Sequence, residues 1–174
     1  MKMKEASGMK FIKRDNGFTL IEVLAVVIII GVLAAVLIPK VASSTANARR
    51  KADVATAHQV KAALDRYQVD TGAYPKTADL TASTGTVAST ALIPKYISKL
   101  DKSTTQQFAP DGKQGFGVAS LTVDAVDKTL FSIPDIKTLA PTNTIMIYLS
   151  GDGLAAEVRA YDESLTTVLW SSAN

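Results

Sequence analysis

The sequence predicts an α+β fold, in which a long N-terminal helix packs its second half on an antiparallel β-sheet head. Three observations support this prediction. Residues 18–38 contain only two polar side chains, residues 40–71 lack proline and glycine and repeat apolar residues every three to five positions, and apolar and polar residues alternate after Gly115. Helix should therefore precede sheet along the chain, as in α+β domains.

The composition excludes several classes of protein. A chain of 174 residues suits one domain with a real core. The absence of cysteine excludes a disulfide scaffold, a thiolate metal site and a cysteine nucleophile. The single histidine, His58, excludes a multi-histidine metal site and gives a serine hydrolase little support. We therefore expect no cofactor, no bound metal and no catalytic residue.

The positive charge of the chain is concentrated at its start. Residues 1–17 hold five basic and two acidic side chains, whereas residues 18–174 hold 14 of each kind. The net charge of +3 therefore belongs to a short basic leader and not to a nucleic-acid-binding domain.

The apolar run at residues 18–38 predicts a helix that can cross a membrane. Such a helix is about 31 Å long, close to the thickness of the bilayer core. A signal anchor or a cleaved secretory signal is the simplest interpretation, but the run exceeds the roughly 7–15 apolar residues of a secretory signal. Glu22 also lies inside it, where a carboxylate costs about 2.5–3.5 kcal/mol to insert. We therefore expect a functional role for Glu22.

Glu22 needs a cationic partner, and the sequence has no Lys or Arg between Phe18 and Pro39. A cut between Gly17 and Phe18 would create one, because Phe18 would then carry a new α-amine four residues before Glu22. The two charges could pair within one chain or between neighbouring chains. Alternatively, Glu22 snorkels to the membrane surface, which is compatible with the first role.

The segment GFTLIEVL at residues 17–24, behind a basic leader, resembles the processing site of type IV prepilins and the related pseudopilins. The resemblance extends closely over about residues 10–75. It implies that a prepilin peptidase cuts after Gly17, that Phe18 is then N-methylated, and that Glu22 is required for assembly. It also places Pro39 where many pilins have a helix-kinking proline.

The resemblance further implies a ladle-shaped pilin with three segments. Residues 1–17 form the cleaved leader, residues 18–39 the transmembrane and filament-core helix, and residues 40–174 the head, with an amphipathic helix at 40–71, a loop region at 72–112 and a β-sheet at 113–171. The leader would face the cytoplasm. The precursor would cross the inner membrane once and the assembled filament would be extracellular.

Residues 18–71 predict one helix of about 54 residues. Pro39 should kink or locally melt this helix, and Gly72 suits a left-handed residue after its end. The apolar half must be surrounded by lipid or by copies of itself. Both environments are apolar, so a subunit could move from membrane to filament without exposing this half to water.

Within the head, residues 91–100 predict a short helix or turn, and the sheet should follow. Asp101 and Asp111 are two distant carboxylates, fewer oxygens than the six to eight that calcium requires, so we expect solvated loop charges. Trp170 should anchor the core. The strands are expected at residues 116–123, 129–133, 145–149, 154–161 and 166–170. The last three should form an antiparallel meander. Its hairpin at residues 149–154 contains two glycines, which we expect to adopt positive φ.

The favoured hypothesis is a type IV pilus subunit, and the alternative is a pseudopilin of a type II secretion or DNA-uptake apparatus. The implied partners are identical or homologous subunits, the prepilin peptidase, an assembly platform and the inner membrane. Residues 49–51 are a basic cluster, which either contacts DNA or forms a solvated or salt-bridged helix face; we expect the second. A membrane-anchored enzyme has little support, because His58 has no nucleophile at a telling spacing.

Overall fold

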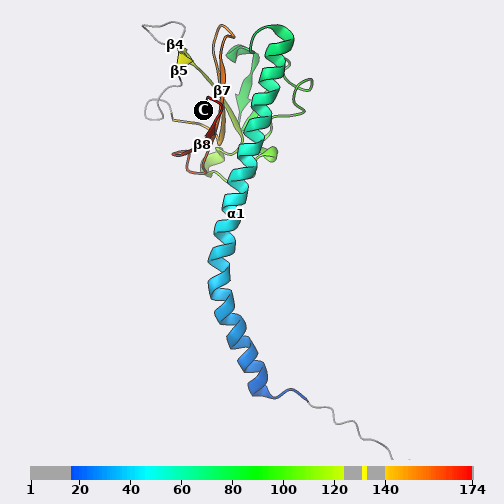
Figure 1. Ribbon diagram of the computed structural model, residues 1–174, viewed down its shortest axis with the longest axis vertical. Coiled ribbons are helices and arrows are strands. Elements are labelled where there is room, and N and C mark those ends of the chain that lie inside the picture. Colours follow the sequence, from blue (N-terminus) through cyan, green and yellow to red (C-terminus); the bar gives the residue numbers. More distant parts are fainter. Residues whose placement is uncertain (1–16, 124–130, 133–139, 174) are drawn as a thin grey trace, which may run out of the picture. The chain divides into compact units, whose positions relative to one another are not determined.

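The computed structural model describes residues 17–123, 131–132 and 140–173 and confirms the predicted α+β class. The chain divides into two compact units, the first ending at Ala42 and the second beginning at Ser43. The helix α1 (Leu20–Thr71), coloured from blue to green in Figure 1, contributes residues to both units.

Helix α1 has 52 residues and begins two positions later than predicted. It continues through Pro39 without interruption, so the helix is not melted there, and the kink at Pro39 stays a prediction. Gly72 follows its end with a φ of +85°, and the Gly72 N–H donates to the carbonyl oxygen of Gln68 at 2.8 Å. The predicted left-handed cap is therefore confirmed.

The main sheet of the head has the strand order β3 (Phe116–Ser120), β6 (Ile145–Leu149), β7 (Ala156–Tyr161) and β8 (Val168–Ser171). Strands β6, β7 and β8 form the predicted antiparallel meander. Strand β3, however, pairs with β6 in parallel, so the sheet is mixed and not purely antiparallel. Residues 121–144 provide the long connection that parallel neighbours require, whereas apolar alternation carries no information on strand direction.

Smaller elements flank this sheet. The predicted strands at 116–123 and 129–133 appear as β3, β4 (Thr122–Val123) and β5 (Phe131–Ser132), while part of the second lies outside the described residues. Residues 91–96 form turns, which is one of the two predicted alternatives for residues 91–100. The region predicted as loop also contains the antiparallel pair β1 (Thr81–Ser83) and β2 (Thr86–Ala88) and the short 3₁₀ helices Thr77–Asp79, Lys102–Thr104 and Pro110–Gly112.

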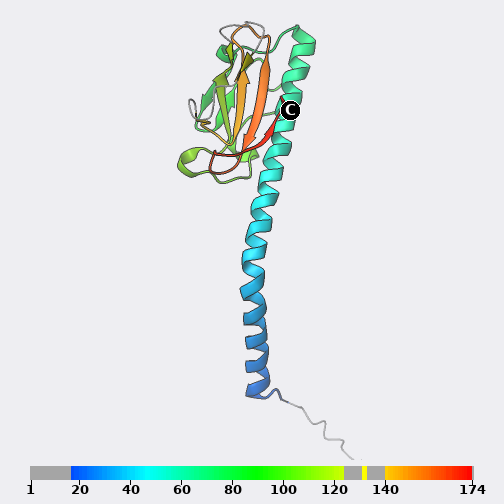
Figure 2. The ribbon, with the colours of Figure 1, turned by 60° about the vertical axis from the view of Figure 1, so that its left-hand side comes forward.

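The core of the head lies between the second half of α1 and one face of the main sheet, which runs alongside this half of the helix in Figures 1 and 2. Ala57, Val60 and Leu64 recur at helical spacing, and Ile145 and Ile147 at strand spacing; all five are buried. Burial of each of the larger side chains contributes about 1.5–3 kcal/mol to the stability of the fold.

The C-terminal strand is secured by ring stacking and by hydrogen bonds. Trp170 packs against the core as predicted, with its ring centroid 4.0 Å from that of His58 on α1. The Ser172 hydroxyl accepts the Val158 N–H at 3.0 Å, and the Ser172 N–H donates to the Val158 carbonyl oxygen at 3.0 Å. The chain has no cysteine and therefore no disulfide, so these contacts hold the C-terminal strand in place.

The hairpin between β6 and β7 differs from the prediction in one respect. Gly153 has a φ of +79°, but Gly151 does not have a positive φ. The Gly153 carbonyl oxygen accepts the Tyr74 N–H at 2.8 Å, which joins the hairpin to the segment that leaves α1. The positive φ is therefore limited to one glycine of the two.

Candidate functional site

The start of α1 is a capping box formed by Thr19 and Glu22. One carboxylate oxygen of Glu22 accepts both the Thr19 N–H and the Thr19 hydroxyl at 2.8 Å, and the Glu22 N–H donates to the Thr19 carbonyl oxygen at 3.1 Å. The pairing satisfies backbone groups that a helix end leaves open and holds a negative charge at the positive end of the helix dipole. The sequence analysis missed this role of Thr19, although the spacing Thr-x-x-Glu is its signature.

The predicted processing residues lie directly before this box. Gly17 and Phe18 precede the helix, and Phe18 is 87% exposed. Glu22 binds the backbone nitrogen of the residue after Phe18, so its carboxylate is held close to the position where a new α-amine would form. No described atom lies within 4 Å of the place that a Cβ on Gly17 would occupy, so glycine is not required there by packing within this chain.

The apolar half of α1 exposes its side chains all round. From Phe18 to Val41 each Leu, Ile and Val side chain is more than half exposed. By length and composition this helix can cross a membrane. Soluble monomers rarely expose contiguous apolar patches of more than a few hundred Å². The apolar helix and the motif before it therefore suggest that the chain is anchored in a membrane.

The basic cluster at residues 49–51 is largely engaged within the head. Arg50 donates to both carboxylate oxygens of Glu163, one of them at 2.9 Å from Nε. The hydrogen bond from Arg50 lowers the pKa of Glu163. The Arg49 guanidinium lies over the Phe108 ring, 4.8 Å from its centroid. These contacts favour a salt-bridged helix face over a DNA-binding surface.

Asp53 is a buried charge that the sequence analysis did not identify. Its carboxylate accepts the backbone N–H groups of Gln106 and Gln107, at 2.6 and 3.2 Å, and the Gln107 Nε2 at 3.0 Å. Gln107 Nε2 also donates to the Tyr161 carbonyl oxygen at 3.1 Å. The network ties α1 to a loop and to β7. The sequence did carry a signal for the burial of Asp53, because its helical spacing places it on the same face of α1 as the buried Ala57.

Asp101 and Asp111 line one open cavity of about 610 Å³, although they are ten residues apart in sequence. Asp101 accepts the Ser103 N–H at 2.7 Å, and this backbone hydrogen bond lowers the pKa of its carboxyl group. Among the described residues no three His, Asp or Glu side chains gather in a group that could hold a metal. Asp101 acts in the structure as the cap of a short turn.

Comparison with known proteins finds similarity in the N-terminal part of the chain. The family model of the prokaryotic N-terminal methylation motif matches residues 12–38, which include Gly17, Phe18 and Glu22. The resemblance stated from the sequence is therefore confirmed for this segment, which is similar to the N-terminal methylation motif.

The relatives define this similarity more closely. The type II secretion system core protein G of Pseudomonas aeruginosa is 42% identical over 65 residues, which are 37% of this chain and 46% of that protein. The corresponding protein of Klebsiella pneumoniae is 37% identical over 65 residues, with the same shares. The type IV major pilin protein PilE of Neisseria gonorrhoeae is 34% identical over 86 residues, 49% of this chain and 50% of that protein. The chain thus spans about half the length of the curated relatives it matches. No solved structure matches the chain.

Proposed function

We propose that this chain is a structural subunit of a helical filament of the pilin type and not an enzyme. The observation that carries the proposal is the exposed apolar half of α1, which begins inside the methylation motif with Glu22 in its first turn. Such a surface is stable only in lipid or against similar helices, and a filament core of identical helices provides the second environment.

The proposed maturation has two steps on the N-terminal residues. A prepilin peptidase in the inner membrane cuts between Gly17 and Phe18, and the new amine of Phe18 is methylated. Residues 1–17 are the cytoplasmic leader, residues 18–39 cross the membrane, and residues 40–174 lie outside. An assembly platform then moves subunits from the membrane into the filament.

Glu22 sets the position of each subunit in this proposal. In the part of the uncut chain that the structure describes, its carboxylate accepts hydrogen bonds from Thr19. After the cut, a cationic amine on the same or a neighbouring chain provides a stronger partner, because a charge pair in an apolar medium is stabilised only when both charges are close. A subunit displaced along the filament would leave the carboxylate without this partner.

Two kinds of filament fit the proposal. A pseudopilus of type II secretion is supported by relatives from Pseudomonas aeruginosa and Klebsiella pneumoniae, which are named for that system. A type IV pilus, which the sequence analysis favoured, is supported by the match to a major pilin over a longer stretch of 86 residues. The pseudopilus is at least as well supported as the pilus.

The N-terminal mass of the assembled protein tests the processing step. We expect chains recovered from sheared filaments to begin with N-methylated Phe18. Gly17→Leu should leave the leader attached and should yield a chain that is 17 residues longer. A mature N-terminus at any other residue would contradict the proposal.

Deletion of the coding sequence separates the two filaments. Loss of surface filaments in electron micrographs with normal protein export indicates a pilus. Loss of export of type II substrates with surface filaments unchanged indicates a pseudopilus. Deletion without either defect would remove both candidates.

A further inference from the structure

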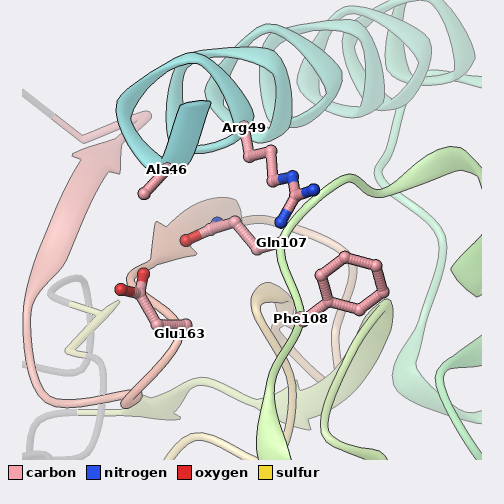
Figure 3. Close-up of a pocket in the computed structure, with 5 residues that line it drawn as sticks. All are labelled: Ala46, Arg49, Gln107, Phe108 and Glu163. Atoms are coloured by element: carbon pink, nitrogen blue, oxygen red, sulfur yellow. The ribbon is translucent and has the colours of Figure 1, made fainter. Parts of the chain in front are cut away.

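A cavity of about 160 Å³ lies between α1 and the loop that contains Gln107, entirely within the second unit (Figure 3). Its lining consists of Ala46, Arg49, Gln107, Phe108 and Glu163. None of these residues belongs to the processing motif, so the cavity is distinct from the site described above.

Gln107 presents an unused hydrogen-bond acceptor at this cavity. The residue is 2% exposed, and its Nε2 donates to the Asp53 carboxylate and the Tyr161 carbonyl. Both partners are acceptors, so the amide cannot be flipped without placing its oxygen against two other oxygens. The oxygen, Oε1, is buried and has no hydrogen-bond partner among the described residues. Buried acceptors of this kind are rare and require an explanation.

The surroundings define the chemistry of the missing donor. Figure 3 shows the amide oxygen of Gln107 directed toward the side of the cavity where Ala46 and Glu163 lie. The lining holds one positive and one negative side chain, Arg49 and Glu163, so their charges together favour neither a cationic nor an anionic donor. A carboxylate or carbonyl group offers no hydrogen to Oε1. An uncharged hydroxyl or amide fits the cavity best.

We infer that this cavity binds an uncharged hydroxyl or amide side chain from a second copy of the chain in the filament. The inference rests on the proposed function. Ala46 lies four residues beyond Ala42, where the first unit ends, so packing of copies through their apolar helices brings neighbouring chains to this part of α1. The chain also offers suitable donors: residues 80–94 carry no charge, and Thr81, Ser83 and Thr84 are exposed.

Filling the cavity tests the inference. Ala46→Leu occupies the cavity from α1 and removes no described hydrogen bond. Ala48→Leu is the matched control, because it makes the same substitution at an exposed position of the same helix. In the full-length chain we expect Ala46→Leu to reduce the yield of sheared filaments at least tenfold. Processing and the melting temperature in detergent should be unchanged, and Ala48→Leu should assemble normally.

Thiol labelling gives a second measurement, which does not depend on filling the cavity. Phe108 and Leu154 are both 68% exposed, and the chain has no cysteine of its own. Phe108→Cys and Leu154→Cys therefore provide single thiols at equally exposed positions. We expect filament assembly to slow maleimide labelling at position 108 at least tenfold more than at position 154.

The outcomes separate the inference from the proposed function. Absence of any pilus or pseudopilus that contains the unaltered chain would contradict both. Normal filaments from Ala46→Leu, an equal loss with Ala48→Leu, or equal labelling changes at the two thiols would overturn the inference alone.

Discussion

At the scale of single residues, Glu22 and Asp53 show two ways of satisfying the hydrogen bonds of a carboxylate, one exposed and one buried. Glu22 begins a helix and is satisfied by its neighbour Thr19, so it can exchange this partner without unfolding anything else. Asp53 is enclosed by α1 and a loop and accepts hydrogen bonds from two backbone N–H groups and one side-chain amide. The first carboxylate is suited to assembly, and the second is suited to stability.

Substitution of Glu22 can separate its charge from its capping role. Glu22→Gln keeps the capping box, which accepts Glu or Gln, but removes the charge, whereas Glu22→Ala removes both. We expect both variants to insert and to be cleaved after Gly17, and filament yield to fall at least tenfold in both, as measured by shearing and immunoblotting. Filaments from Glu22→Gln at the normal level would show that capping, and not charge pairing, is what assembly requires.

Removal of the buried charge at Asp53 should destabilise the head. Asp53→Asn places an amide N–H₂ among N–H donors, which should lower the free energy of unfolding by about 1–3 kcal/mol. Asp111→Asn is the control, because Asp111 is exposed at a φ of +57° that asparagine tolerates. Urea unfolding of the full chain in detergent measures both. Equal midpoints for the two variants would contradict the role given to Asp53.

At the scale of elements, the sequence predicted those parts whose pattern is local. Helix α1 was predicted to within two residues, because an apolar run continues into a helical period and ends at Gly72. The meander β6–β7–β8 followed from alternation and turns. The parallel pairing of β3 with β6 could not be predicted, because it depends on where a long connection returns. The pair β1–β2 was missed because its three-residue strands lie in a Ser- and Thr-rich segment.

The hairpin between β6 and β7 provides a matched pair of glycines. Gly153 has a φ of +79°, and a Cβ there would lie 2.8 Å from the Tyr74 carbonyl oxygen, whereas a Cβ on Gly151 would meet nothing within 4 Å. We expect Gly153→Ala to lower the free energy of unfolding by about 1–3 kcal/mol and Gly151→Ala to change it by less than about 0.5 kcal/mol. Thermal melting followed by circular dichroism compares them. Similar losses in both variants would show that the conformation of Gly153 is not limiting.

At the scale of the whole molecule, the surfaces of the two units differ in how they interact with water. The described part of the first unit is apolar and needs lipid or other helices, and it holds most of the segment at residues 12–38 that matches the methylation motif. The head has its own core and hydrogen-bond network. Sequence alone identified the candidate residues Gly17, Phe18 and Glu22, since motifs are local. It missed the Asp53–Gln107 network, since only folding brings residues 53 and 107 together.

The head should lose stability in acid. Hydrogen bonds from Arg50 lower the pKa of Glu163; for Asp162 burial acts in the opposite direction, but hydrogen bonds from Ser164, Thr167 and Thr166 lower its pKa overall. A carboxyl group with a lowered folded pKa contributes stability above its unfolded pKa, and this is lost as the pH falls through the folded pKa. We therefore expect the urea midpoint to be constant from pH 7 to about 5 and to fall below that.

A single variant provides the control for this pH dependence. Glu163→Gln removes one of the two carboxyl groups but leaves the fold around Asp162 in place, so its urea midpoint should fall less steeply below about pH 5. A midpoint that rises on acidification would contradict the contribution assigned to these groups.

The stacking of Trp170 on His58 has a practical consequence. Trp170 is the only tryptophan of the chain, so the tryptophan fluorescence of the protein reports on the contact between the C-terminal strand and α1. A change in emission wavelength therefore reports when this strand detaches from the helix, without any added dye. The same signal, followed while subunits leave the detergent micelle, would reveal whether the head stays closed during polymerisation.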